Sequence, residues 1–287
     1  MIGAVLSEDK AAAVAPPPQR IVHRRHWGAW LFGALVLALL AALLKAAVTA
    51  RIVDLGVVGQ YLFSPQMLIG ARNSLALGTV ALFIAVLVGL VVALMRVSGN
   101  PILVAVSAAY VYLFRGTPML IQLIFWFNAF PTMFKELHVE LFGVVLAHVP
   151  MTQLITPYAA ALLGLSLAEG AYMAEIIRGG ILAVDAGQRD AARSLGMSTG
   201  RLMRHIVIPQ ASRIIVPATG NQYIMLLKST SLASAIGYLE LLRISTDIYA
   251  SNFRVVELLT VAAFWYLVMT AFATAIQTVL EKKFPHR

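Results

Sequence analysis

Long apolar stretches dominate the pattern of hydrophobic and polar positions along the chain. A helix rises about 1.5 Å per residue, so roughly 20 apolar residues cross the ~30 Å hydrocarbon core of a bilayer. Six stretches have about that length or more: the run from Trp27 to about Leu44, Ser74–Met95, Pro101–Phe130, Ile155–Ile177, Ile214–Leu232 and Val255–Leu280. The chain is therefore predicted to be an all-α polytopic membrane protein with both termini on one side.

Two of the predicted spans contain residues that interrupt a helix. The third is overlong and contains Gly116 and Pro118. Proline lacks a backbone donor and its ring clashes with the preceding turn, so we expect a kink or break there. The fifth loses its apolar character in Lys228-Ser229-Thr230-Ser231. A broken or re-entrant end is expected at that point.

The two ends of the chain differ from the apolar body. Residues 1–26 are rich in alanine and proline and are predicted to be a disordered cytoplasmic tail. Residues 27–50 predict a first spanning helix. The alternative is a cleaved signal peptide, because Val48-Thr49-Ala50 loosely resembles a cleavage site, although the apolar run is long for a signal core. Residues 282–287 are predicted to be a short cytoplasmic tail.

Composition supports a membrane location and suggests an orientation. The 287 residues are 60% hydrophobic and only 12% charged, about half the charge of an ordinary soluble domain. The net charge is +9, and most Lys and Arg residues fall in segments that are cytoplasmic if the N-terminus lies inside. Because cytoplasmic loops are enriched in these cations, both termini are predicted to be cytoplasmic. The lack of cysteine excludes disulfides and thiol chemistry.

The longest polar interruption, 178–213, is placed in the cytoplasm by this orientation. Residues 188–195 are good helix formers, and Gly196 is suited to cap the end of that helix. Ser198 is suited to cap a second short helix, which we expect Pro209 to end. The pattern predicts two short helices in an L. By shape alone the element is either a helix lying on the membrane surface or a docking site for a partner.

The residues of this loop resemble the signature of permeases in type I, binding-protein-dependent ABC importers. That signature is Glu-Ala-Ala, three residues, Gly, nine residues, Ile, one residue and Leu-Pro. Asp190-Ala191-Ala192, Gly196, Ile206, Ile208 and Pro209 occupy its positions, with Asp in place of Glu and Ile in place of Leu. The resemblance implies that the loop 187–211 is a coupling helix in a cleft of an ATPase subunit. The implied ATPase-coupling residues are Asp190, Ala191, Ala192, Gly196, Ile206 and Pro209.

Other segments resemble the polar amino-acid branch of these permeases. They are 115–122, which begins Arg115-Gly116-Thr117-Pro118, together with 170–181 and 209–232. The resemblance covers residues 70–281. It implies a transmembrane domain with a core of five helices, to which the helix at 27–50 is an addition. Tyr112 departs from the family, in which many members carry Glu before the Phe-Arg pair.

Ionisable groups inside a bilayer are costly, so each one is a functional candidate. From the helix rise, Arg115, Glu169 and Lys228 are predicted to converge on the middle third of the membrane. A zwitterionic amino acid needs a cation for its carboxylate and an acceptor for its ammonium. Arg115 or Lys228 is a candidate for the first role and Glu169 for the second. Neutral hydrogen bonds to substrate are expected from Gln122, Ser166, Asn221 and Thr230.

Structural roles for the same charged groups stay open at this point. In these structural roles, Arg115 pairs with Glu169 or with a helix-end carbonyl at the kink instead of binding substrate. Lys228 then caps the end of its own helix. Glu175 and Arg178 stand three residues apart on one helix. They are expected to form a structural ion pair rather than to bind a ligand.

The sequence contains no motif for nucleotide hydrolysis or metal binding. No lysine follows a glycine, so there is no Gly-Lys-Ser/Thr phosphate loop, and no His/Asp/Glu cluster has metal-ligand spacing. The chain is therefore predicted not to be an enzyme by itself and to hold no cofactor. In an ATP-driven complex, ATP and Mg²⁺ would be bound by the partner ATPase.

The leading interpretation is the transmembrane permease subunit of an ABC importer for a polar amino acid in the bacterial inner membrane. Its predicted partners are two ATPase subunits, a second permease copy or paralogue, a periplasmic or surface-tethered solute-binding protein and membrane lipid, but no nucleic acid. The main alternative is an ion-coupled secondary amino-acid transporter that uses Glu169 as its coupling site. A membrane scaffold or receptor that transports nothing is another. Which amino acid is carried, and whether the permease pair is a homodimer or a heterodimer, stays open.

Overall fold

The computed structural model describes residues 27–49, 53–141 and 144–283. It divides into two units, Met1–Ile52 and Val53–Arg287. Within the first unit, α1 (Trp27–Thr49) is a helix of 23 residues, or about 34 Å at the usual rise. The expected helix at 27–50 is therefore present, and its crossing of the membrane stays a prediction. The tail predicted at 1–26 lies outside the described residues.

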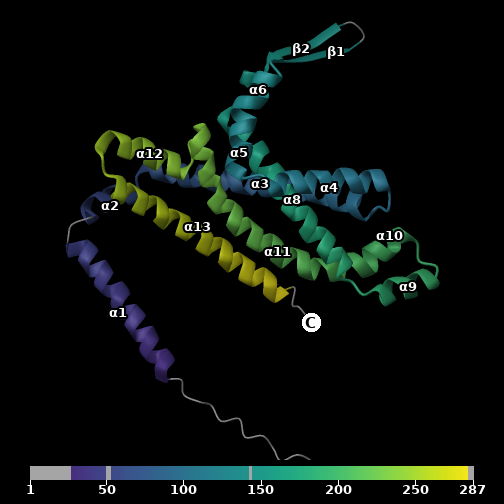
Figure 1. Cartoon of the computed structure of the whole chain (residues 1–287), viewed down its shortest axis with the longest axis horizontal. Helices are drawn as coiled ribbons and strands as arrows, with labels where there is room; N and C mark the ends of the chain where they lie inside the picture. The colour runs from purple at the N-terminus through teal and green to yellow at the C-terminus, as the bar shows by residue number, and fades with distance from the viewer. Residues whose placement is uncertain (1–26, 50–52, 142–143, 284–287) are drawn as a thin grey trace, which may run out of the picture. The chain divides into compact units, whose positions relative to one another are not determined.

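The second unit is a bundle of helices with one small hairpin (Figure 1). The elements from the start of this unit to the hairpin are α2 (Leu55–Leu62), α3 (Pro65–Val97), α4 (Pro101–Gly116), α5 (Met119–Ile124), the π-helix η1 (Phe125–Ala129), α6 (Phe130–Met133), β1 (Glu136–Leu141) and β2 (Val144–Pro150). Those that follow are α7 (Met151–Leu154), α8 (Pro157–Leu182), α9 (Ala186–Ser194), α10 (Thr199–Leu202), the π-helix η2 (Met203–Val207), α11 (Ile208–Ser229), the 3₁₀ helix η3 (Thr230–Ile236), α12 (Leu241–Asn252) and α13 (Val255–Lys283).

A capping residue followed by proline starts three of the long helices. Ser64, Asn100 and Thr156 have extended backbones, and their side chains accept hydrogen bonds from the free N–H groups of the first turn. The next residue is proline in each case, which has no N–H to leave unsatisfied at the first helical position. The helix α3 therefore begins nine residues before Ser74, where the predicted apolar run starts. The run starts late because the first turns of α3 carry polar residues on one side.

Fewer of the described helices are long and apolar enough to cross a membrane than the six spans predicted from the sequence. By length and apolar composition, α3, α8 and α13 are able to cross a bilayer, as is the bent pair formed by α4 with α5–α6. α11 has 22 residues, sufficient for a span, but it contains Pro217, Asn221 and Gln222 and is less apolar. The total of six spans stays a prediction. α13 extends through Lys283, and residues 284–287 lie outside the described part, so the cytoplasmic C-terminal tail at 282–287 stays a prediction.

Both predicted helix interruptions are confirmed. α4 ends at Gly116, and the helix after Pro118 departs from the axis of α4 by 103°. Thr117 between them has extended backbone, as expected of a residue before proline. Beyond Ser229, α11 tightens into the 3₁₀ helix η3, and the left-handed backbone of Gly237 ends it at φ = 80°.

The hairpin was not predicted from the sequence. β1 pairs antiparallel with β2, and the register shifts at Val139/Glu140. Except for this two-stranded sheet, the described chain is helical, as the all-α fold class requires. The segment between the third and fourth apolar runs does alternate polar and apolar residues over Glu136–Leu141, a strand signal that is missed when only long apolar runs are considered.

Close packing of α3 on α8 forms the centre of the second unit (Figure 1). A Cβ added to Gly89 of α3 would lie 2.6 Å from Met173 Cβ and 2.9 Å from the backbone nitrogen of Ala174, both on α8. On the facing helix, a Cβ at Gly170 would meet Val88 Cγ1 and Tyr110 Oη at 2.9 Å. Small residues therefore let the two backbones approach, as at other helix contacts within membranes.

A buried carboxylate joins α3, α12 and α13. Glu240 is fully buried and caps the start of α12 by accepting from the N–H groups of Leu242 (2.9 Å) and Arg243 (2.6 Å). Tyr266 Oη of α13 donates to Glu240 at 2.6 Å, and Ser74 Oγ of α3 donates at 3.4 Å. Both carboxylate oxygens are thus satisfied by donors from three different helices.

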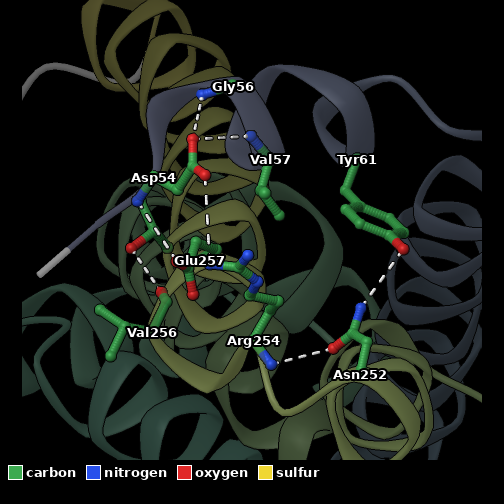
Figure 2. Close-up of polar contacts among 9 residues, drawn as sticks. Asp54, Gly56, Val57, Tyr61, Asn252, Arg254, Val256 and Glu257 are labelled. Atoms are coloured by element: carbon green, nitrogen blue, oxygen red, sulfur yellow. Dashed lines mark hydrogen bonds and ion pairs between the residues drawn. The ribbon is translucent and has the colours of Figure 1, made fainter. Parts of the chain in front are cut away.

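A second polar cluster fastens α2 to the start of α13 (Figure 2). The Asp54 side chain caps α2, accepting from the Gly56 N–H at 2.9 Å, and the Asp54 N–H donates to Glu257 Oε1 at 3.2 Å. Arg254 lies 3.6 Å from that same Glu257 oxygen and 4.0 Å from Asp54 Oδ2. The N-terminal end of the second unit is therefore held by charge and hydrogen bonds rather than by apolar contact alone.

We expect Gly89→Ala to lower the thermal stability of the purified chain in detergent. The added methyl group meets backbone atoms of α8 that cannot move independently, and overpacking of this kind typically costs about 1–3 kcal/mol. Gly179→Ala is the matched control, because a Cβ at Gly179 of α8 meets nothing within 4 Å. An unchanged or raised unfolding temperature for Gly89→Ala would show that α3 and α8 are not held at this distance.

Candidate functional site

The loop predicted to contact an ATPase begins with α9 (Figure 1). Asp185 caps it, accepting from the Gln188 N–H at 3.0 Å. The helix ends in a Schellman turn: Gly196 N–H donates to Arg193 O at 2.9 Å and Met197 N–H to Ala192 O at 3.1 Å. Gly196 has φ = 75°, which an L-residue rarely adopts. The predicted C-terminal cap at Gly196 is confirmed.

The second half of the loop differs from its prediction. Ser198 has the extended backbone of an N-cap at the start of α10, but its side chain makes no capping hydrogen bond. Pro209 does not end the second helix. α10, η2 and α11 form one continuous helical stretch, and Pro209 lies in the first turn of α11. The π turn just before it widens the helix, so the ring and the missing N–H of Pro209 are accommodated where a regular α turn would break.

The predicted coupling residues divide into exposed and buried sets. Asp190, Ala191, Gly196 and Pro209 are exposed, and Asp190 pairs with Arg193 at 3.5 Å. Ala192 is only 3% exposed and packs in a cluster with residues of α8, α10 and α11, against which the half-buried Ile206 also lies. The second alanine and the isoleucine of the motif therefore hold the loop together, whereas the first alanine and the carboxylate face outward.

Leu195 is the residue of this loop that the sequence reasoning missed. It lies at the turn between α9 and Gly196 and is 84% exposed, an unusual position for a leucine in a well-capped turn. The motif gave no weight to this position because it falls among the unspecified residues. Its one available sequence signal was an apolar side chain next to a turn glycine in a polar loop.

The polar group deepest in the second unit consists of residues from α8 and α11. Ser166 and Glu169 stand three apart on α8 and are 2% and 3% exposed. The Gln222 side chain of α11 lies within hydrogen-bonding reach of the Glu169 carboxylate. Within the described residues, Glu169 Oε1 and Ser166 Oγ have no hydrogen-bond partner. Buried polar atoms are costly without partners, so these two atoms remain available to bind a ligand or water.

Two of the predicted neutral ligands have structural partners. The Gln122 amide nitrogen donates to Phe114 O (2.9 Å), Thr117 O (3.1 Å) and Thr117 Oγ1 (2.8 Å). It therefore holds the break between α4 and α5, and only its carbonyl oxygen is left buried without a partner in the described chain. Thr230 is fully buried and donates to Leu227 O at 2.7 Å.

The predicted convergence of three charges is not reproduced as direct contact. Arg115, Asn221 and Lys228 are exposed side chains. The Arg115 guanidinium lies 5.0 Å from the ring centroid of Tyr172, a cation–π arrangement, and among the described residues it forms no ion pair with Glu169. Glu175 and Arg178 do pair, at 2.7 Å, as expected for a structural contact.

Gln222 lies beside Glu169, whereas the α11 amide expected from the sequence to hydrogen-bond the substrate was Asn221. Gln222 is buried, whereas Asn221, one residue earlier, is exposed. Adjacent helix positions differ by about 100° in direction, so only the rotation of α11 decides which amide faces inward. Polar and apolar residues are mixed around α11, and its sequence therefore did not determine that rotation.

Long apolar helices, a broken span and a capped polar loop between two of the helices together define a helical membrane transport subunit. The chain belongs to the family of binding-protein-dependent transport system inner membrane components, whose pattern matches residues 85–285.

Relatives of known role are similar over most of their length. The arginine transport system permease protein ArgU of Corynebacterium glutamicum is 39% identical over 276 residues, which cover 96% of this chain and 85% of that protein. The glutamine transport system permease protein GlnP of Escherichia coli is 32% identical over 219 residues, covering 76% and 93%. The nopaline transport system permease protein NocM of Agrobacterium fabrum is 37% identical over 220 residues, covering 76% and 87%.

Solved structures agree with this assignment. One described as an amino acid ABC transporter with histidines is 33% identical, with a TM-score of 0.68 over 80% of this chain and 99% of that one. An inward-facing conformation of the MetNI methionine ABC transporter shares the fold, with a TM-score of 0.59 at 18% identity, covering 77% and 96%.

The chain is therefore a transmembrane permease subunit of an amino-acid ABC importer and a multi-pass protein of the inner membrane. Its family supplies the membrane-spanning part of such importers and implies an ATPase and a solute-binding protein as partners. The alternative of an ion-coupled secondary transporter is not favoured.

Proposed function

We propose that this subunit carries a polar amino acid past Glu169 and that a separate ATPase drives it through the loop from Asp190 to Pro209. The observation that carries the proposal is that the loop connects the two helices, α8 and α11, that hold the buried residues Glu169 and Gln222. α8, which holds Glu169, leads directly into α9, and the helical stretch that begins at α10 continues into α11, which holds Gln222.

The loop is built to move as one body. The Asp185 cap and the Gly196 turn fix both ends of α9. Gln210 Nε2 at the start of α11 donates to Gln188 Oε1 of α9 at 2.6 Å. If a partner displaced α9, α11 would therefore move with it, because the segment between the two helices is held by these hydrogen bonds. Alternating access requires two arrangements of these helices and a partner that shifts the equilibrium between them.

Leu195 is the proposed anchor for the ATPase. A single leucine held 84% exposed beside a rigid turn would bury most of its surface in a cleft of the partner, which is worth about 1.5–3 kcal/mol. Asp190 and Ala191 lie in the same exposed part of α9. Ala192 and Ile206 keep the shape of the loop rather than touch the ATPase.

The proposed complex contains two ATPase subunits, a second permease copy or paralogue, and a periplasmic or surface-tethered solute-binding protein. ATP and Mg²⁺ belong to the ATPase subunits, and this chain holds no cofactor. Both termini are proposed to lie in the cytoplasm. The concentration of Arg residues around α9 and α10 supports that orientation, because it places them on the side where membrane proteins gather positive charge.

The proposed substrate contact is between Glu169 and a cationic group of the amino acid. Of the described residues, none pairs an arginine or lysine with this buried carboxylate, and one of its oxygens is free. An ammonium or guanidinium would satisfy the charge on binding. The 39% identity to a protein named for arginine transport makes arginine the first amino acid to test.

Leu195→Ala is expected to weaken the association with the ATPase without affecting membrane insertion. Removing the exposed side chain takes away the proposed anchor, so co-purification of the ATPase and substrate-stimulated ATP hydrolysis should fall about tenfold or more. Leu195→Met is the control, since it keeps an apolar side chain of similar volume. Wild-type coupling in Leu195→Ala would show that the ATPase binds elsewhere.

Glu169→Gln is expected to reduce amino-acid uptake in reconstituted vesicles by roughly tenfold or more, because it removes the charge from the proposed cation site. Expression, unfolding temperature and ATPase co-purification should stay at wild-type levels. Glu281→Gln is a matched control, as Glu281 is an exposed residue near the end of α13. Normal uptake by Glu169→Gln would remove this residue from the pathway. Uptake driven by an ion gradient without ATP would favour secondary transport.

A further inference from the structure

A basic cavity lies where the ends of α3 and α8 meet the loop. Its volume is about 550 Å³, and four arginines from three helices line it. Arg96 lies in the last turn of α3, Arg178 is near the end of α8, and Arg189 and Arg193 are on α9. None of these arginines belongs to the proposed substrate pathway, and of the four only Arg193 also reaches the exposed surface around Leu195, where it pairs with Asp190.

Only half of this positive charge is neutralised. Arg178 pairs with Glu175 at 2.7 Å, and Arg193 pairs with Asp190 at 3.5 Å. Across the described part of the chain, Arg96 and Arg189 have no ion pair; Glu175 acts on Arg96 only at longer range. One terminal nitrogen of Arg96, Nη1, is buried without any hydrogen-bond partner there. A guanidinium donor withdrawn from water in this way requires an acceptor.

Apart from Ser98 and Thr199, the remaining lining is apolar and continues the surface of the spans. Leu94 and Val97 from the last turns of α3 line the cavity together with Leu182 from the end of α8. All three side chains are exposed in this chain. The cavity therefore joins two unpaired guanidinium groups to an apolar wall at the end of two bilayer-length helices. A free phosphate would match only the arginines, whereas a phospholipid would match both parts.

We infer that this cavity binds the phosphate headgroup of an anionic phospholipid from the leaflet beside the loop. Arg96 and Arg189 hold the phosphate oxygens, and Leu94, Val97 and Leu182 contact the upper part of an acyl chain. Basic pockets between helices at the cytoplasmic side of a membrane protein suit such headgroups. The inference requires the loop to lie at the membrane surface, but it does not depend on the proposed ATPase contact.

A bound headgroup would connect the loop to the membrane-spanning body. Arg189 belongs to α9 and Arg96 to α3, and no direct hydrogen bond joins these two helices among the described residues. A phosphate that accepts from both would hold α9 against the end of α3. Lipid composition would thereby influence how firmly the loop is positioned.

The test uses the full chain purified in detergent and analysed by native mass spectrometry with added phosphatidylglycerol or phosphatidylcholine. Wild-type protein should retain phosphatidylglycerol preferentially. Each arginine near an anionic headgroup is worth about fivefold in affinity, so Arg96→Gln/Arg189→Gln should weaken phosphatidylglycerol binding by roughly tenfold or more. The matched control is Arg201→Gln/Arg204→Gln, which removes two exposed arginines of the same loop that do not line the cavity. This control should bind as wild type.

Further measurements separate the possible sources of an effect. Arg96→Lys/Arg189→Lys keeps both charges and should retain most of the binding; a loss as large as with glutamine would indicate disturbed packing and overturn the inference. Equal losses in the cavity and control variants would also overturn it, as would equal retention of phosphatidylcholine. Displacement of the lipid by millimolar inorganic phosphate would assign the site to a soluble anion. Loss of ATPase co-purification with lipid retained would assign the arginines to the protein partner instead.

Discussion

The close approach of α3 and α8 is the constraint on which the rest of the second unit depends. At Gly89, one added carbon would already meet the backbone of α8. In a membrane, apolar side chains gain little by leaving lipid for protein, so contact of this kind has to come from close van der Waals packing of small residues. Two features rely on it. The burial of Glu169 and the basic cavity both depend on α8 lying directly against α3.

The same packing relates the polar loop to the polar group inside the bundle. α8 is fixed against α3 along its length, while α11 also contacts α8 and α13. The loop connects α8 to α11, and the inward-facing carboxylate and amide come from these same two helices. A partner that moves the loop therefore has a direct connection to Glu169 and Gln222. The anionic lipid inferred above would act on the fixed end of that connection, beside α3.

Sequence alone predicted the features that depend on local chemistry. The break at Gly116–Pro118, the turn at Gly196, the degenerate end of α11 and the Glu175–Arg178 pair all follow from backbone preferences or short spacings. It failed where tertiary structure decides. Pro209 was expected to end a helix and instead follows a π turn. Asn221 was placed inward where Gln222 lies, and Glu240 was not considered although donors from several helices meet on it. The sequence alone indicates neither helix rotation nor burial by other helices.

The π turn at Met203–Val207 has a consequence for the chemistry deep in the bundle. A π turn contains about one residue more than an α turn, and one residue corresponds to about 100° of rotation around a helix. Everything after it on α11 is therefore turned relative to a helix without the insertion. In the helix as it stands, Gln222 is buried beside Glu169 and Asn221 is exposed. The directions of these two amides thus depend in part on the backbone geometry of a turn more than a dozen residues earlier, in the helical stretch that follows the loop.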